Sequence, residues 1–171
     1  MMSNYSTCLE IILEHEGGFV NHPKDPGGIT NYGVTKKVYD KWVGRETTPK
    51  EMRDLTHEDV APIYKKNYWN RAKCDQLPMG VDLCVFDWAV NSGVSRSAKA
   101  LQRIVGVEQD GGIGPMTLQA VAEVEVNEII EQMHYTRQSF YEKLSTFDTF
   151  GKGWTRRNDE TKEKALEMAH G

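Results

Sequence analysis

The sequence predicts a mainly α-helical fold with one small turn-rich region. Apolar residues recur at helical spacing along several segments, and glycines, prolines and capping residues separate those segments. The longest run rich in turn-forming residues lies between positions 19 and 35. We therefore expect about seven helices with a small loop or hairpin. The length of 171 residues allows one compact core, or two small lobes that share one.

The first elements are a helix and a loop. Residues 6–15 carry apolar side chains at helical spacing, and the two glycines after Glu16 supply a left-handed stop, so Glu16 is expected at the helix end. The next segment contains Asp25-Pro26-Gly27-Gly28 and Asn31-Tyr32-Gly33, which are typical of tight turns. Residues 19–35 are thus predicted to form a loop or a small hairpin.

Capping signals and apolar spacing predict the later helices. Thr48 and Thr56 each precede acidic residues of a first helical turn, and the second of these helices should continue to Trp69. Residues 80–91 are apolar nearly all round, which predicts a helix in the middle of the core. Four further helices are predicted. The first is capped by Ser95, the second begins at Gly114-Pro115, the third begins at Asn127, and the last is capped by Asn158 and runs to Ala169.

Charge and cysteine usage exclude several classes of function. With 21 basic and 25 acidic residues, the chain lacks the positive excess that nucleic-acid binding needs. No apolar run approaches the roughly 18 residues that cross a bilayer, and the N-terminus lacks a cleaved export signal, so we expect no membrane insertion. Cys8, Cys74 and Cys84 are scattered, which favours buried thiols over disulfides or zinc. We expect no metal and no cofactor.

Two carboxylates and a hydroxyl lie close together in the N-terminal part of the sequence: Glu16, Asp25 and Thr30. Glycoside hydrolysis needs one protonated carboxylic acid, and commonly a second carboxylate that orients water or stabilises the charged transition state. Glu16 at a helix end suits the first role, because the negative end of the helix dipole disfavours an ionised acid. Asp25 in the loop would stay hydrated and ionised. The structural alternative is a surface helix end followed by an ordinary turn.

The run Glu16-Gly17-Gly18, followed by Asp25-Pro26-Gly27-Gly28-Ile29-Thr30-Asn31-Tyr32-Gly33-Val34-Thr35, closely resembles the N-terminal motif of glycoside hydrolase family 108. These are lysozyme-like N-acetylmuramidases of phages and bacteria, including toxin-secretion activators. The spacing of Glu16, Asp25 and Thr30 also resembles the catalytic triad of phage-type lysozymes, which usually place the Thr one residue further on. The family commonly has Tyr where this chain has Phe19. The resemblance implies a lysozyme-like catalytic lobe over residues 1–93.

A second resemblance covers the rest of the chain. Leu101-Gln102, Asp110-Gly111 and Gly114-Pro115 with Thr117 resemble the pattern of predicted peptidoglycan-binding segments. Each of these residues also suits a helix cap, a turn or a core position, which is the structural alternative. We expect residues 94–171 to form a helical, peptidoglycan-binding-like lobe that packs with residues 1–93 as one compact unit.

The leading hypothesis is a muramidase that cleaves the β-1,4 bond between N-acetylmuramic acid and N-acetylglucosamine in the glycan strands of peptidoglycan. Glu16 would be the general acid, Asp25 would stabilise charge or activate water, and Thr30 would help to hold that water. Inversion and retention both remain open, because they depend on the separation of the two carboxyl groups. The predicted substrate-binding residues are Tyr32, Asn91 and Trp69; Asn91 also suits a helix stop, and Trp42 is a further candidate for stacking on a sugar.

Two alternatives fit the same residues. One is a chitinase- or chitosanase-like hydrolase, and the other is a non-catalytic protein that binds peptidoglycan or assists secretion. We expect a monomer that is cytoplasmic until a holin or another export route takes it to the cell wall or periplasm, where an endolysin would be bacteriolytic. Phage, prophage and bacterial origins all remain open.

Overall fold

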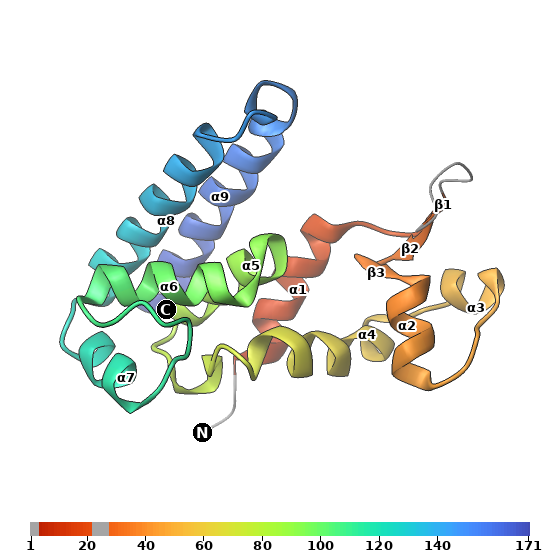
Figure 1. The fold of residues 1–171 in the computed structure, drawn as a ribbon, viewed down its shortest axis with the longest axis horizontal. Helices are drawn as coiled ribbons and strands as arrows, with labels where there is room; N and C mark the ends of the chain where they lie inside the picture. The colour runs from red at the N-terminus through yellow and green to blue at the C-terminus, as the bar shows by residue number, and fades with distance from the viewer. Residues whose placement is uncertain (1–3, 22–27) are drawn as a thin grey trace. The chain divides into compact units, whose positions relative to one another are not determined.

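A computed structural model describes residues 4–21 and 28–171, and these residues form a mainly α-helical protein, as predicted (Figure 1). The described residues contain nine α-helices, compared with the seven expected. They divide into two compact units. The N-terminal unit is Tyr5–Asn67, and the C-terminal unit is Tyr68–Gly171 together with Asn4.

The N-terminal unit combines helices with one small sheet. The three strands form an antiparallel sheet in the order β1-β2-β3, which confirms the predicted hairpin region. The elements are α1 (Tyr5–Glu16), β1 (Val20–Asn21), β2 (Ile29–Asn31), β3 (Val34–Thr35), α2 (Lys36–Val43), α3 (Pro49–Arg53) and α4 (His57–Tyr64). A π-helical turn, Lys65–Trp69, continues α4 along the chain.

Local capping chemistry explains most of these bounds. Thr48 and Thr56 both form the predicted capping boxes, in which the threonine hydroxyl accepts from the third helical N–H and the acidic side chain at that position accepts from the threonine N–H. Helix α2 was not predicted, although Thr35 caps it and Gly44 ends it at φ 79°. None of its residues is fully buried, so the apolar pattern that identifies a core helix is weak there.

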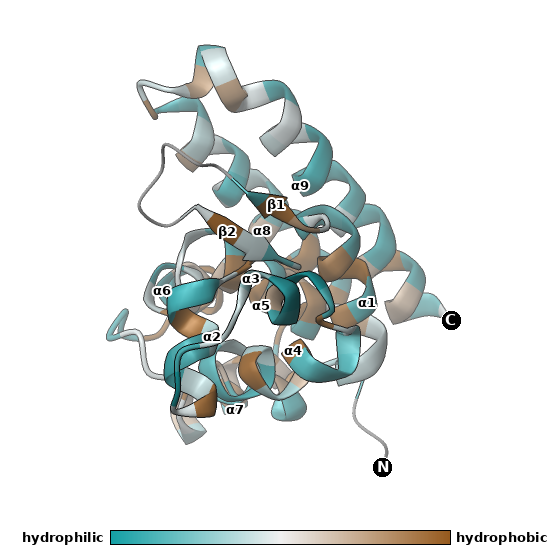
Figure 2. Cartoon of the chain, turned by 90° about the vertical axis from the view of Figure 1, so that its right-hand side faces the viewer, coloured by the Kyte–Doolittle hydropathy of each residue, from teal (hydrophilic) through white to brown (hydrophobic). Residues whose placement is uncertain are grey.

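The C-terminal unit is built around α5 (Val81–Ser92). Every residue from 81 to 89 is buried, and α5 packs against three helices, α6 (Val94–Val105), α8 (Val126–Glu142) and α9 (Phe147–His170). Helices α8 and α9 lie side by side as a hairpin (Figure 1), and α9 is largely hydrophilic along its length (Figure 2). A short 3-10 turn (Cys74–Gln76) and α7 (Pro115–Ala122) complete the unit, and α7 opens with the predicted proline.

Two predicted caps in this unit are wrong. Gly93, with φ 105°, ends α5 and precedes α6, so Ser95 lies inside the first turn of α6 instead of capping it. Asn158 lies in the middle of α9. Its buried amide donates to the carbonyl of His134 at 3.0 Å and to Oε1 of Gln138 at 3.2 Å. A residue type that suits a cap is used here to join two helices.

The centre of the C-terminal unit holds a buried charge cluster. Asp87 of α5 is fully buried and lies 2.7 Å from Nη1 of Arg137 and 3.0 Å from Nη2 of Arg157. The hydroxyl of Thr161 donates to the same carboxylate at 3.1 Å. Burial opposes ionisation of Asp87, but the two guanidinium groups outweigh it and hold its pKa below the ordinary value. The cluster ties α5 to both α8 and α9.

Three further findings concern the described residues. No helix among them has the length and apolar content to cross a membrane. No group of three or more His, Cys, Asp or Glu side chains among them could hold a metal ion. The cysteines Cys8, Cys74 and Cys84 are buried and free, as the sequence predicted.

Asp87→Asn should lower the free energy of unfolding by about 3 kcal/mol at neutral pH, because it leaves two buried guanidinium groups without a counter-charge. Folding lowers the pKa of Asp87, so its contribution to the free energy of unfolding is fully present above the pKa of the unfolded chain, near 4. That contribution is lost as the pH falls through the lower pKa of the folded protein. Urea denaturation of the wild type and of Asp87→Asn should therefore show a difference in the free energy of unfolding that decreases as the pH is lowered from about 6 to about 2.

Asp148→Asn is the matched control, because Asp148 is exposed in the first turn of α9. It should change stability by less than about 0.5 kcal/mol at either pH. If Asp87→Asn has the same free energy of unfolding as the wild type, the cluster does not hold the three helices together.

Candidate active site

Glu16 lies at the end of α1, as predicted. Gly17 adopts φ 76° and its N–H returns to the carbonyl of Leu13 at 3.3 Å, which ends the helix immediately after Glu16. Glu16 is half-buried. A β-carbon placed on Gly17 or Gly18 would have no described atom within 4 Å. The described atoms therefore leave space around these two glycines, next to the end of α1.

A tight turn between β2 and β3 faces Glu16. Asn31 pairs with Val34, so Tyr32 and Gly33 are the two central residues of the hairpin. Both have positive φ, 50° and 75°, which is typical of a type I′ turn. Positive φ is uncommon for tyrosine, so the surrounding contacts must hold this conformation.

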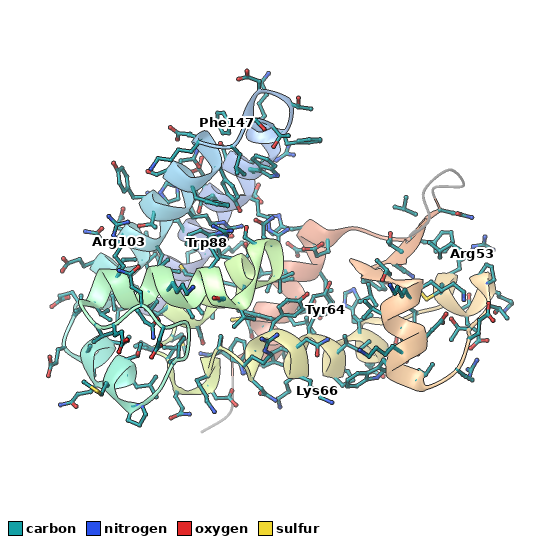
Figure 3. The ribbon with its side chains drawn as sticks, viewed as in Figure 1. Arg53, Tyr64, Lys66, Trp88, Arg103 and Phe147 are labelled. Atoms are coloured by element: carbon teal, nitrogen blue, oxygen red, sulfur yellow. The ribbon has the colours of Figure 1, made fainter. Side chains whose placement is uncertain are left out.

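Contacts with two helices, α3 and α4, fix the turn. The hydroxyl of Tyr64, on α4 and labelled in Figure 3, donates to the Tyr32 carbonyl at 2.7 Å. The Tyr32 ring packs edge-on against His57, with ring centroids 4.8 Å apart. The amide of buried Asn31 donates to the Met52 carbonyl at 2.9 Å and so attaches β2 to α3. The backbone of the turn is thus held from α3 and from α4.

The Glu16 carboxylate lies directly over this turn. A β-carbon on Gly33 would lie 2.8 Å from Oε2 of Glu16 and 2.6 Å from Oη of Tyr64, closer than atoms can approach. The positive φ favours glycine here, and any other residue would displace the ends of the Glu16 and Tyr64 side chains. The structure therefore brings together a carboxyl group, a phenol hydroxyl and a fixed turn of backbone within the N-terminal unit.

The other residues predicted for catalysis are placed differently. Thr30 is a half-buried residue of β2, paired across the sheet with Val20 and Thr35. Asp25 lies outside the described residues. Of the predicted site residues that the structure describes, Glu16 and Tyr32 meet at the Gly33 turn.

Trp69 does not present a surface for a sugar. It belongs to the C-terminal unit, is 0% exposed, and packs edge-on against Phe86 with ring centroids 5.1 Å apart. Its indole N–H donates to Oδ1 of Asp75 at 2.7 Å. A ring without an exposed face cannot stack on a ligand in this conformation, so the prediction that Trp69 contacts substrate is corrected: it is a packing residue. Trp42, in α2, is 39% exposed and has the Lys66 ammonium 5.7 Å from its ring.

Asn91 is half-buried near the end of α5, in the C-terminal unit. Its Oδ1 atom accepts from the hydroxyls of Tyr141 and Ser92. The helix stop that the sequence suggested at this point is made by Gly93, whose N–H returns to the Ala89 carbonyl at 2.8 Å. The amide oxygen of Asn91 therefore has a structural use in joining α5 to α8.

Sequence reasoning missed the two residues that fix the turn. Tyr64 is buried on the apolar face of α4, and nothing in the local sequence indicates which carbonyl its hydroxyl contacts. Asn31 was noted only as a turn residue, and its partners lie 21 and 22 positions away. A buried polar residue needs a partner, but its identity is a tertiary property.

Comparison with known proteins identifies the family. The family model described as glycosyl hydrolase 108 matches residues 9–93, and a model described as a predicted peptidoglycan domain matches residues 96–159. The solved structure of SagA from Brucella abortus is 41% identical to this chain, with a TM-score of 0.85, and the match covers 98% of this chain and 97% of that one. The chain belongs to the glycosyl hydrolase 108 family. A search of curated proteins found no match.

Membership confirms the lysozyme-like, mainly α fold that the resemblance implied. It also ties the chain to peptidoglycan through the second match. The two matches meet between residues 93 and 96, whereas the compact units divide between Asn67 and Tyr68. That residues 1–93 and 94–171 form two lobes packed as one unit stays a prediction.

Gly33→Ala should destabilise the protein more than Gly17→Ala does. Both positions have φ near 75°, so each alanine costs about 1 kcal/mol in backbone strain. Only the β-carbon at Gly33 would also collide with Glu16 and Tyr64, which should at least double the loss. Chemical denaturation followed by circular dichroism measures both values. Equal losses would mean that Glu16 and Tyr64 move aside freely and that the turn does not fix the carboxylate.

Proposed function

We propose that this protein is a muramidase that hydrolyses the β-1,4 bond between N-acetylmuramic acid and N-acetylglucosamine, with Glu16 as the general acid. The observation that carries the proposal is the Glu16 carboxylate, which lies over the Gly33 turn with open space beside Gly17 and Gly18. The glycosyl hydrolase 108 match supports glycoside hydrolysis, and the peptidoglycan domain match supports the choice of polymer over chitin or chitosan.

The backbone of the turn at Gly33 positions the Glu16 side chain. Gly33 lets the carboxylate approach the turn, while Tyr64 and Asn31 hold the turn itself. An acid that must meet one glycosidic oxygen benefits from such a fixed position, because misplacement by about 1 Å can cost a hundredfold in rate. Gly17 and Gly18 are exposed, and no described atom lies within 4 Å of a β-carbon placed on either.

In the proposed reaction, Glu16 donates its proton to the glycosidic oxygen as the C–O bond breaks. The bond electrons leave with that oxygen, and positive charge develops on the sugar ring. Water then bonds through its oxygen to the anomeric carbon and releases a proton, which restores the protonated form of Glu16. Asp25 would stabilise this charge or activate the water, and Thr30 would help to hold the water. Tyr32 and Asn91 are proposed to contact the glycan.

The proposed place of action is the cell wall, with peptidoglycan glycan strands as the partner. A protein that starts in the cytoplasm would reach this polymer through a holin or another export route, and we propose that it acts as a monomer. A protein that binds peptidoglycan without cleaving it is the other function that the second family match favours.

Glu16→Gln should reduce the release of reducing ends from purified peptidoglycan by at least about a thousandfold and leave the fold intact, because the amide cannot donate the proton that the leaving oxygen needs. Glu14→Gln, an exposed change on the same helix, should keep wild-type activity. Mass spectrometry should identify the new ends as N-acetylmuramic acid, and NMR of the first anomer formed distinguishes inversion from retention.

Full activity of Glu16→Gln would remove Glu16 from the mechanism. No release by folded wild type would favour the non-catalytic binding protein. Faster release from chitin or chitosan than from peptidoglycan would favour the other class of hydrolase.

A further inference from the structure

An open groove runs along α6 and α8 in the C-terminal unit, with a volume of about 920 Å³. Four cationic side chains line it: Arg96, Lys99 and Arg103 from α6, and Lys143 at the end of α8. Among the described residues, no aspartate or glutamate lines the groove. The whole chain has a net charge of −4, so a groove with four positive and no negative side chains departs sharply from the average surface.

These four cations are available for a ligand. In residues 4–21 and 28–171, none of the four lies within ion-pair distance of a carboxylate. By contrast, Arg137 and Arg157 in the interior both bind Asp87. The Arg96 guanidinium packs over the Phe140 ring at 4.2 Å, which holds the cation at the groove wall.

The groove also offers contacts for uncharged parts of a ligand. Its lining includes Trp88, which is only 2% exposed and forms part of the groove floor; Trp88 and Arg103 are labelled in Figure 3. Tyr135 is 70% exposed beside the groove, and hydroxyl and amide side chains complete the lining. The fitting ligand carries acidic groups, hydrogen-bonding groups and some apolar surface.

We propose that this groove binds the carboxylate-bearing peptides attached to the glycan strands of peptidoglycan. All four cations lie within residues 96–159, the segment that matches the peptidoglycan domain. Those peptides carry free carboxylates, amides and alkyl side chains, which match the cations, polar groups and aromatic rings of the groove. This inference rests on the proposed function for the choice of polymer, and it assigns the peptide part of that polymer to this groove.

The test compares two soluble ligands by isothermal titration calorimetry: a disaccharide–tetrapeptide from peptidoglycan, and the same disaccharide with its peptide removed. Wild type should bind the peptide-bearing ligand at least about tenfold more tightly, and the advantage should fall as salt rises from about 50 to about 300 mM. Lys99→Glu combined with Arg103→Glu should abolish the advantage. Lys164→Glu, an exposed charge change on α9, should retain it.

Equal binding of the two ligands by wild type would overturn the proposal, as would a Lys99→Glu/Arg103→Glu protein that folds normally and keeps the advantage. Tighter binding of inorganic polyphosphate than of the disaccharide–tetrapeptide would also overturn it in favour of a phosphate polymer. Lys99→Gln combined with Arg103→Gln repeats the test without charge reversal and should give the same loss. In both ligands N-acetylmuramic acid is the reducing end, so neither contains the bond at its C1 atom that a muramidase cleaves. The groove can therefore be tested even if hydrolysis fails, and hydrolysis can succeed even if the groove fails.

Discussion

The absence of a side chain at Gly33 is the constraint on which the candidate active site depends. The Glu16 carboxylate and the Tyr64 hydroxyl both occupy space that a β-carbon at Gly33 would fill. The same residue provides one of the two positive φ values of the turn, and Tyr64 secures the other through the Tyr32 carbonyl. One glycine thus connects the end of α1, the hairpin and α4. The chemistry proposed for Glu16 uses a position that backbone geometry creates.

The C-terminal unit uses arginine in two opposite ways. Inside, Arg137 and Arg157 neutralise Asp87, and three helices become mutually dependent because a buried charge is costly without its partners. Outside, Arg96 and Arg103 line a groove in which no carboxylate of the described residues neutralises them. Helix α8 takes part in both, since it carries Arg137 toward the interior and lines the groove with other residues. The internal cluster therefore supports the wall on which the groove is built.

The sequence predicted what local chemistry controls. The stop after Glu16, the capping boxes at Thr48 and Thr56 and the buried α5 are confirmed because each depends on residues within a few positions. The errors concern partners that are distant in sequence. Asn158 is of a type that often caps helices, but its side chain hydrogen-bonds to α8. Trp69 is of a type that often stacks on sugars, but it is buried in the core. The contact of Glu16 with Gly33 joins positions 17 residues apart, so motif spacing could suggest the site but not its geometry.

Helix α5 shows how the two family segments depend on each other. By sequence it belongs to the glycosyl hydrolase match, which ends at residue 93. By packing it belongs with α6, α8 and α9, which come from the peptidoglycan-domain match and the residues just beyond it. Its nine consecutive buried residues would expose a largely apolar helix to water without those partners, and Asp87 would lose both of its arginines. The segment that carries Glu16 therefore needs the second segment to cover its own last helix, which gives a physical reason for the two segments to occur in one chain.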